Sequence, residues 1–157
     1  MNEDNFNDID FQIDTVNLMP GSNFTFSLYG ENWKSIPINP FPLDSNTVFQ
    51  VFSKVDSISS IQGIGFSDGE RNIKYSFFGN EQLDIEEWIP VYQGLNNLGE
   101  WHSYELPIGN DWLAWHDSLS NLLDILFINS SNGSSPTGNI FFSLVRDITN
   151  DLNIPPS

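Results

Sequence analysis

Alternating apolar and polar positions predict β-strands along most of this chain. Residues 46–55 and residues 71–78 each place three large apolar side chains on one face, the pattern of a half-buried strand. Those side chains are Phe49, Val51 and Val55 in the first segment, and Ile73, Tyr75 and Phe77 in the second. Residues 122–129, except for Asp124, and residues 140–145 are largely apolar on both faces, which predicts central strands covered from two sides.

Five shorter segments have the same character and are bounded by Gly, Pro, Asn or Asp. They are residues 11–18, 24–29, 61–66, 88–93 and 101–106. Turn dipeptides such as Asp68-Gly69 and Asn132-Gly133 separate the segments at the spacing of a β-sandwich. Residues 111–119 are the one helix candidate, and a structured loop is the alternative for this segment. We therefore expect an all-β fold, a two-sheet antiparallel β-sandwich of the jelly-roll type.

Length and chain ends predict the domain organisation. The 157 residues suit one domain, and we expect a single β-sandwich over residues 1–152. The end, residues 153–157, contains two consecutive prolines and is typical of a linker into a further domain of a multidomain parent. The polar, acidic start has no apolar run, so no signal peptide is expected in this stretch. No window is apolar enough for membrane insertion.

Charge and cysteine content narrow the classes of partner and chemistry. The chain has 21 Asp and Glu against 5 Lys and Arg, a net charge of −16. Such a surface repels phosphate backbones, so nucleic acid is not an expected partner. The absence of cysteine excludes disulfides, thiolate catalysis and cysteine-type zinc sites.

Tryptophan clustering is the strongest functional signal. Four of the five Trp residues lie within 28 positions, between Trp88 and Trp115, and polar side chains surround them. An aromatic ring can stack on the apolar face of a pyranose while amides and carboxylates bind its hydroxyls. The stacking candidates are Trp88, Tyr92, Trp101, Trp112 and Trp115, and the polar candidates are Arg71, Gln93, Asp111 and His116.

The competing interpretation is that these rings are core residues. Strand parity places Tyr104 with Leu106 on the inward face, so Trp101 is the expected exposed ring on that strand. Trp112 and Trp115 are the better stacking candidates, because binding residues concentrate in loops and turns. Two or more Trp rings exposed in a groove would favour binding. Burial of all five would favour a structural domain.

Three stretches carry a resemblance to a known family. They are residues 61–66 (Ile-Gln-Gly-Ile-Gly-Phe), residues 75–79 (Tyr-Ser-Phe-Phe-Gly) leading into the Trp-rich segment, and the final strand candidate from residue 139 to residue 148. Together they resemble carbohydrate-binding modules of the β-jelly-roll, galactose-binding-like type over roughly the last hundred residues. The resemblance implies glycan binding on a concave sheet face or at loop tips, in an extracellular or cell-surface protein.

The same resemblance implies a structural Ca²⁺ that joins the first and last strands. The acidic residues at matching positions are Asp8, Asp10, Asp14, Asp147 and Asp151. The chain departs from the family at Ser143, where an acidic residue often follows the aromatic residue of the last strand. The alternative is that these carboxylates only solvate the surface.

Catalysis is the least supported class. His102 and His116 are the only histidines, and neither lies near a Gly-x-Ser-x-Gly motif. A two-carboxylate glycosidase stays open, because its chemistry needs only two acids about 5–9.5 Å apart. With 21 acids, however, a pair at that distance is expected by chance. The sequence thus predicts a non-catalytic module that attaches a larger extracellular protein to a polysaccharide. The alternative is a structural or protein-interaction domain of a surface adhesin or filament.

Overall fold

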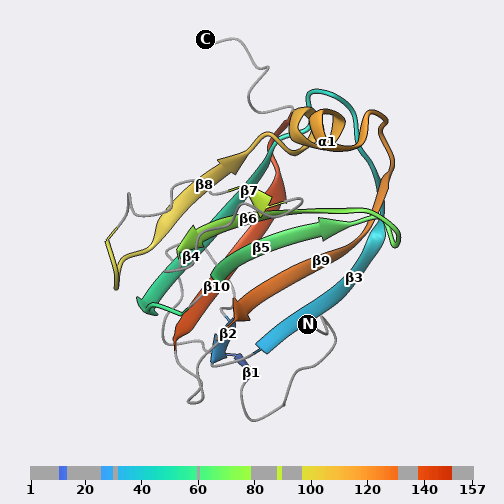
Figure 1. The fold of residues 1–157 in the computed structure, drawn as a ribbon. Helices are drawn as coiled ribbons and strands as arrows, with labels where there is room; N and C mark the ends of the chain where they lie inside the picture. Colours follow the sequence, from blue (N-terminus) through green and yellow to red (C-terminus); the bar gives the residue numbers. More distant parts are fainter. Residues whose placement is uncertain are drawn as a thin grey trace, which may run out of the picture.

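The computed structural model describes residues 11–13, 26–29, 32–59, 61–78, 88–89, 97–130 and 138–149. In this described part of the chain, ten strands form two five-stranded sheets that face each other, and one helix lies at the end of the sandwich (Figure 1). The all-β sandwich expected from the sequence is therefore confirmed. No helix in these ranges has the length and apolar character required for a membrane span.

Sheet A has the strand order β1-β2-β10-β4-β8, and sheet B has the order β3-β9-β5-β6-β7. The strands of sheet A are β1 (Phe11–Ile13), β2 (Phe26–Tyr29), β10 (Asn139–Asp147), β4 (Phe49–Ser57) and β8 (His102–Leu106). Those of sheet B are β3 (Asn32–Pro42), β9 (Asn121–Ser130), β5 (Ile61–Ser67), β6 (Asn72–Phe78) and β7 (Trp88–Ile89). Neighbours pair antiparallel except β6 and β7, which pair parallel and so depart from the prediction.

The main core fills the space between the sheets, where apolar side chains of both sheets meet. Phe77 of β6 stacks on Tyr104 of β8, with ring centroids 4.0 Å apart and the rings 2° from parallel. Phe127 of β9 meets Phe142 of β10 edge to face at 4.9 Å. Burial of each such side chain contributes about 1.5–3 kcal/mol, so these ring pairs hold the two sheets together.

A second buried cluster lies in sheet B and is separate from the main core. It consists of Trp33, Ile61, Leu126 and Ile128. In β9, residues 126 to 128 are therefore covered on both faces, as the continuous apolar run predicts. Trp33 is 7% exposed and belongs to this cluster.

Strand β3 is the element that the sequence analysis missed. Three prolines, at positions 37, 40 and 42, argue against a strand because proline cannot donate to a ladder. The structure places β3 at the edge of sheet B, where only one side of the strand has to pair. An edge strand tolerates proline for that reason.

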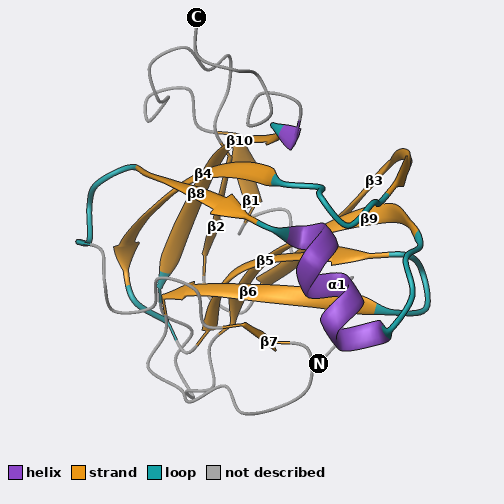
Figure 2. Cartoon of the chain, turned by 90° about the horizontal axis from the view of Figure 1, so that it is seen from above, coloured by secondary structure: helices purple, strands orange, loops and turns teal. Residues whose placement is uncertain are grey.

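The helix α1 (Ile108–His116) follows β8 and crosses toward sheet B over the end of the sandwich (Figure 2). It begins and ends three residues earlier than the predicted 111–119. A Cβ at Gly109 would lie 1.9 Å from the backbone oxygen of Asp44, so the helix start needs a glycine there. The backbone N–H of Gly109 donates to Thr47 O at 3.1 Å, which ties the helix to the turn before β4.

Candidate functional site

Helix α1 carries four of the predicted binding residues, and the helical period separates them. Ile108 and Trp112 are one turn apart and share the buried face. Trp112 is 0% exposed, whereas Trp115 lies on another face and is 45% exposed. The expectation that Trp112 stacks on a ligand is therefore wrong, because its ring is part of the main core.

The buried indole of Trp112 is enclosed by two other predicted binding residues. The guanidinium carbon of Arg71 lies 5.6 Å from the centre of the Trp112 ring, and the His116 ring lies 4.7 Å from it. A cation over an aromatic face is attracted by the ring quadrupole. Arg71 and His116 therefore cover this end of the core.

Asp68 organises the polar groups around Arg71, and the sequence analysis did not single it out. Its carboxylate accepts hydrogen bonds from Ser120 Oγ at 2.5 Å, from Arg71 Nε at 3.2 Å, and from the backbone N–H groups of Glu70 and Arg71. Burial by itself raises the pKa of Asp68, but these hydrogen bonds outweigh it and lower the pKa to about 2. The turn between β5 and β6 is thereby tied to the segment that leads into β9.

Three more polar side chains at this end, those of Tyr75, Asp111 and His116, are also engaged within the fold. Tyr75 Oη donates to Asp111 Oδ2 at 2.7 Å, and burial together with this carboxylate raises the pKa of Tyr75. His116 Nε2 lies 2.9 Å from the carbonyl oxygen of Asn72. Arg71 Nη1 donates to Ser118 Oγ at 3.0 Å. We call Asp68, Arg71, Asp111 and His116 the latch cluster, because they fasten α1 to sheet B.

Trp101 directly precedes β8, and α1 follows the far end of this strand (Figure 1), so the length of β8 separates Trp101 from the latch cluster. Its ring is half-buried, and Lys54 Nζ lies 5.7 Å from the ring centre. The same ammonium group lies 4.6 Å from the ring of Phe141 and 3.8 Å from Asp56 Oδ2. Lys54 is thus held between two rings on the outer face of sheet A.

The outer face of sheet A also carries polar side chains from three adjacent strands. Phe49 and Val51 point into the core, so Gln50 between them points outward. Gln50 pairs with Glu105 of β8 on one side and with Arg146 of β10 on the other. We call Arg146, Gln50 and Glu105, together with Ser103, the polar row.

Hydrogen bonds connect the polar row across the strands. Arg146 Nε donates to Gln50 Oε1 at 2.8 Å, and Gln50 Nε2 donates to Ser103 Oγ at 3.1 Å. Ser103, Glu105 and Arg146 are exposed, and Gln50 is half-buried. Glu105 and Trp101 are four residues apart along β8, a distance of about 13 Å. The polar row leaves no local pattern in the sequence, because its three strands lie far apart in the chain.

Several predicted site residues fall outside the described residues. They are Tyr92, Gln93, Asp8, Asp10, Asp14 and Asp151. Trp88 lies in β7, where its backbone pairs with Lys74. Of the predicted calcium ligands, only Asp147 lies in the described part, and its Oδ1 accepts from the backbone N–H and the hydroxyl of Thr149. Ca²⁺ takes six to eight oxygen ligands, so Asp147 alone does not make a site.

Within the described ranges, no three His, Asp or Glu side chains gather closely enough to bind a metal ion. Comparison of the chain with protein-family models, with curated proteins and with solved structures gave no match. The resemblance to carbohydrate-binding modules therefore stays a prediction, and function has to be argued from the geometry of the fold.

Proposed function

We propose that this β-sandwich is a non-catalytic carbohydrate-binding module and that its ligand lies on the outer face of sheet A. The observation that carries the proposal is the polar row beside a half-buried tryptophan on one sheet face. Arg146 uses one of its five N–H donors on Gln50, which leaves others for a ligand. Glu105 adds a carboxylate acceptor, and Ser103 adds a hydroxyl group.

These groups suit sugar chemistry. A pyranose presents neighbouring hydroxyls that act as donors and acceptors, and an apolar C–H face that stacks on an indole ring. The polar row extends along β8 from Ser103, two residues from Trp101, to Glu105, about 13 Å from Trp101, and this length favours an oligosaccharide over one sugar ring. Lys54 holds the Trp101 ring from one side, which lowers the entropy cost of presenting that ring to a ligand.

The strand order is compatible with the predicted jelly roll, which we include in the proposal. Leaving β1 and β7 aside, the chain passes between the sheets at every step from β2 to β10 except β5 to β6. Sheet A then contains β2, β10, β4 and β8, and sheet B contains β3, β9, β5 and β6. Eight strands in two such sheets are the arrangement that jelly rolls have.

Glycan titration of two matched tryptophan variants tests the proposal. Neutral plant, algal and microbial polysaccharides are titrated while Trp fluorescence and binding heat are recorded. Trp101→Ala is expected to weaken binding by about 2- to 12-fold, the effect of losing one aromatic stack of about 0.5–1.5 kcal/mol. Trp115→Ala is the control, because Trp115 is an exposed ring on α1.

The outcome of this titration decides whether the protein binds glycan and which surface binds it. If the Trp101→Ala variant binds glycan as the wild type does and the Trp115→Ala variant does not, the binding site lies on α1. No change in Trp fluorescence and no binding heat with any polysaccharide of the panel would contradict carbohydrate binding.

The second candidate is a structural or protein-interaction domain of a surface adhesin or filament. Burial of Trp33 and Trp112 favours it, because both rings serve packing. Of the four described Trp side chains, two are buried, Trp101 is half-buried and Trp115 is exposed. Neither of the two conditions set from the sequence is met, so the titration has to separate these functions.

A calcium titration tests the metal prediction separately. A melting temperature that rises with Ca²⁺ and returns with EGTA would support a structural ion. An unchanged melting temperature would count against it.

A further inference from the structure

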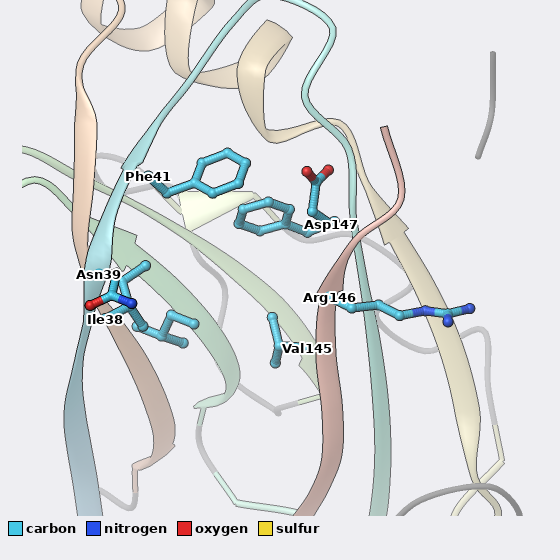
Figure 3. Close-up of a pocket in the computed structure, with 8 residues that line it drawn as sticks. Ile38, Asn39, Phe41, Val145, Arg146 and Asp147 are labelled. Carbon is cyan, nitrogen blue, oxygen red and sulfur yellow. The ribbon is translucent and has the colours of Figure 1, made fainter. Parts of the chain in front are cut away.

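A cavity of about 280 Å³ opens between the two sheets, on the side where β3 faces β10 (Figure 3). Five apolar side chains from both sheets line it. They are Ile38 and Phe41 of β3, Phe49 of β4, Ile125 of β9 and Val145 of β10. Asn39, Arg146 and Asp147 complete the lining. We call this space the edge cavity.

Irregular pairing on both sides of the edge cavity accounts for its position. In β3 the register with β9 shifts between Pro37 and Phe41, so four steps of β3 face only two of β9. A prolyl residue has no N–H to continue the ladder. In β10 a second register shift falls between Phe142 and Leu144, directly before the part of the strand that lines the cavity. Two bulged strands therefore face each other here and leave space.

Four apolar residues of the edge cavity are only partly buried against the main core. Ile38, Phe41, Ile125 and Val145 are half-buried, whereas Phe49 at the back of the cavity is 5% exposed. Phe41 and Phe49 meet edge to face with ring centroids 5.1 Å apart. Apolar surface exposed beside a core favours a bound apolar molecule that removes it from water.

The polar side chains of the lining are exposed, and two of them are hydrogen-bonded to other residues. Arg146 extends away from it along the outer face of sheet A, where its Nε donates to Gln50 (Figure 3). Asp147 Oδ1 accepts two hydrogen bonds from Thr149, and Asn39 is exposed. Burial of an unpaired charge or polar group is costly, so the cavity disfavours charged or strongly polar molecules.

We propose that the edge cavity binds a small uncharged apolar molecule, such as one or two fused aromatic hydrocarbon rings. The size follows from the volume. A dry apolar cavity of about 150 Å³ takes up benzene, and pockets for drug-sized molecules begin near 300 Å³. The edge cavity lies near the upper end of this interval. The edge cavity shares Arg146 with the polar row, but its apolar lining lies between the sheets, so neither proposal depends on the other.

Methyl NMR with benzene and naphthalene as probes tests the site. Saturable ring-current shifts are expected at the methyl groups of Ile38, Ile125 and Val145. The methyl groups of Ile58, 42% exposed in the turn after β4, are the internal control and should not shift. No saturable shift up to the solubility limit of both probes would overturn the proposal.

Filling the cavity gives a second test. Val145→Phe and, from the opposite sheet, Ile38→Phe are each expected to weaken naphthalene binding by at least about tenfold, because the added ring occupies the space of the ligand. Ile58→Phe is the matched control and should bind as the wild type does. The dispersion of the methyl spectrum shows which variants are folded. Unchanged binding in a folded cavity-filled variant would show that the probe binds elsewhere.

Discussion

The α1 end of the sandwich and the outer face of sheet A carry the same residue types in different surroundings. Each has a tryptophan ring close to a cation and carboxylates near it. At the α1 end, Arg71 covers the buried Trp112, and Asp68 accepts hydrogen bonds from two segments of the chain. On sheet A, Arg146 and Glu105 are exposed on either side of Gln50.

The difference shows that residue type alone does not identify a binding site. Arg71, Asp111 and His116 have the chemistry of sugar recognition, yet each is hydrogen-bonded within the fold. A ligand would have to replace those bonds, and leaving a buried partner unsatisfied costs about 1–3 kcal/mol. The polar row keeps exposed donors and acceptors, so a ligand competes mainly with water.

Truncation of Trp112 is expected to have the largest effect. Trp112→Ala should lower the free energy of unfolding by about 3–5 kcal/mol, because it leaves a cavity under α1. Trp115→Ala, three residues along the same helix, should change it by no more than about 0.5 kcal/mol. Urea denaturation of both variants measures the difference. Equal effects would contradict the assignment of one ring to the core and the other to the surface.

Removal of the Asp68 charge is expected to loosen the latch cluster. Asp68→Asn should lower the free energy of unfolding by about 1–3 kcal/mol, since it weakens hydrogen bonds from Ser120 and Arg71. Glu70→Gln is the control, because it removes the same charge from an exposed side chain in the same turn.

The pH dependence of the Asp68→Asn effect has a definite sign. The pKa of Asp68 falls from an ordinary 3.8 to about 2 in the folded protein. Its contribution to stability is therefore fully present above the ordinary value and is lost as the pH falls through about 2. The free energies of unfolding of the wild type and of the Asp68→Asn variant, measured by chemical denaturation, should therefore converge as the pH falls toward about 2. A difference that stays constant from pH 5 to pH 2 would contradict the ionised hydrogen bond.

Tyr75 and Asp111 should show a smaller coupling. Tyr75→Phe removes the hydroxyl that donates to Asp111 Oδ2, and a loss of about 0.5–1.5 kcal/mol is expected. A double-mutant cycle with Asp111→Asn isolates the interaction from other effects of each change. Additive losses would mean that this contact contributes nothing to the latch cluster.

The polar row should contribute least to stability and most to binding. Gln50→Ala is expected to change the free energy of unfolding by no more than about 0.5 kcal/mol, because its hydrogen bonds to Ser103 and Arg146 are exposed. The same variant should weaken glycan binding in the titration described above. A large loss of stability without any loss of binding would make the polar row a structural feature like the latch cluster.

The alternation of apolar and polar residues was sufficient to predict which side chains of several strands enter the core. Alternation placed Phe49 and Val51 of β4 and Ile73 and Tyr75 of β6 in the core, and each is buried. It also placed Tyr104 inward, where it is 1% exposed. These predictions succeed because a strand has a period of two and only one of its faces can enter the core.

The errors occurred where position in the sheet or on the helix decides the outcome. β3 was missed because its prolines suit an edge strand, and edge position is a property of the whole sheet. Phe41, which the sequence analysis left outside any strand, lies in β3 for the same reason. Trp112 was expected at the surface, and a helix that begins at Ile108 turns it inward.

The amino-acid sequence by itself determined the fold class, the strands with a clear period of two, and the acidic character of the surface. The tertiary structure alone decided which polar residues are hydrogen-bonded within the fold and which remain exposed. The physical reason is that alternation acts between neighbours in the chain. Satisfaction of a hydrogen-bonding group depends on partners such as Arg146 and Gln50, which are 96 positions apart.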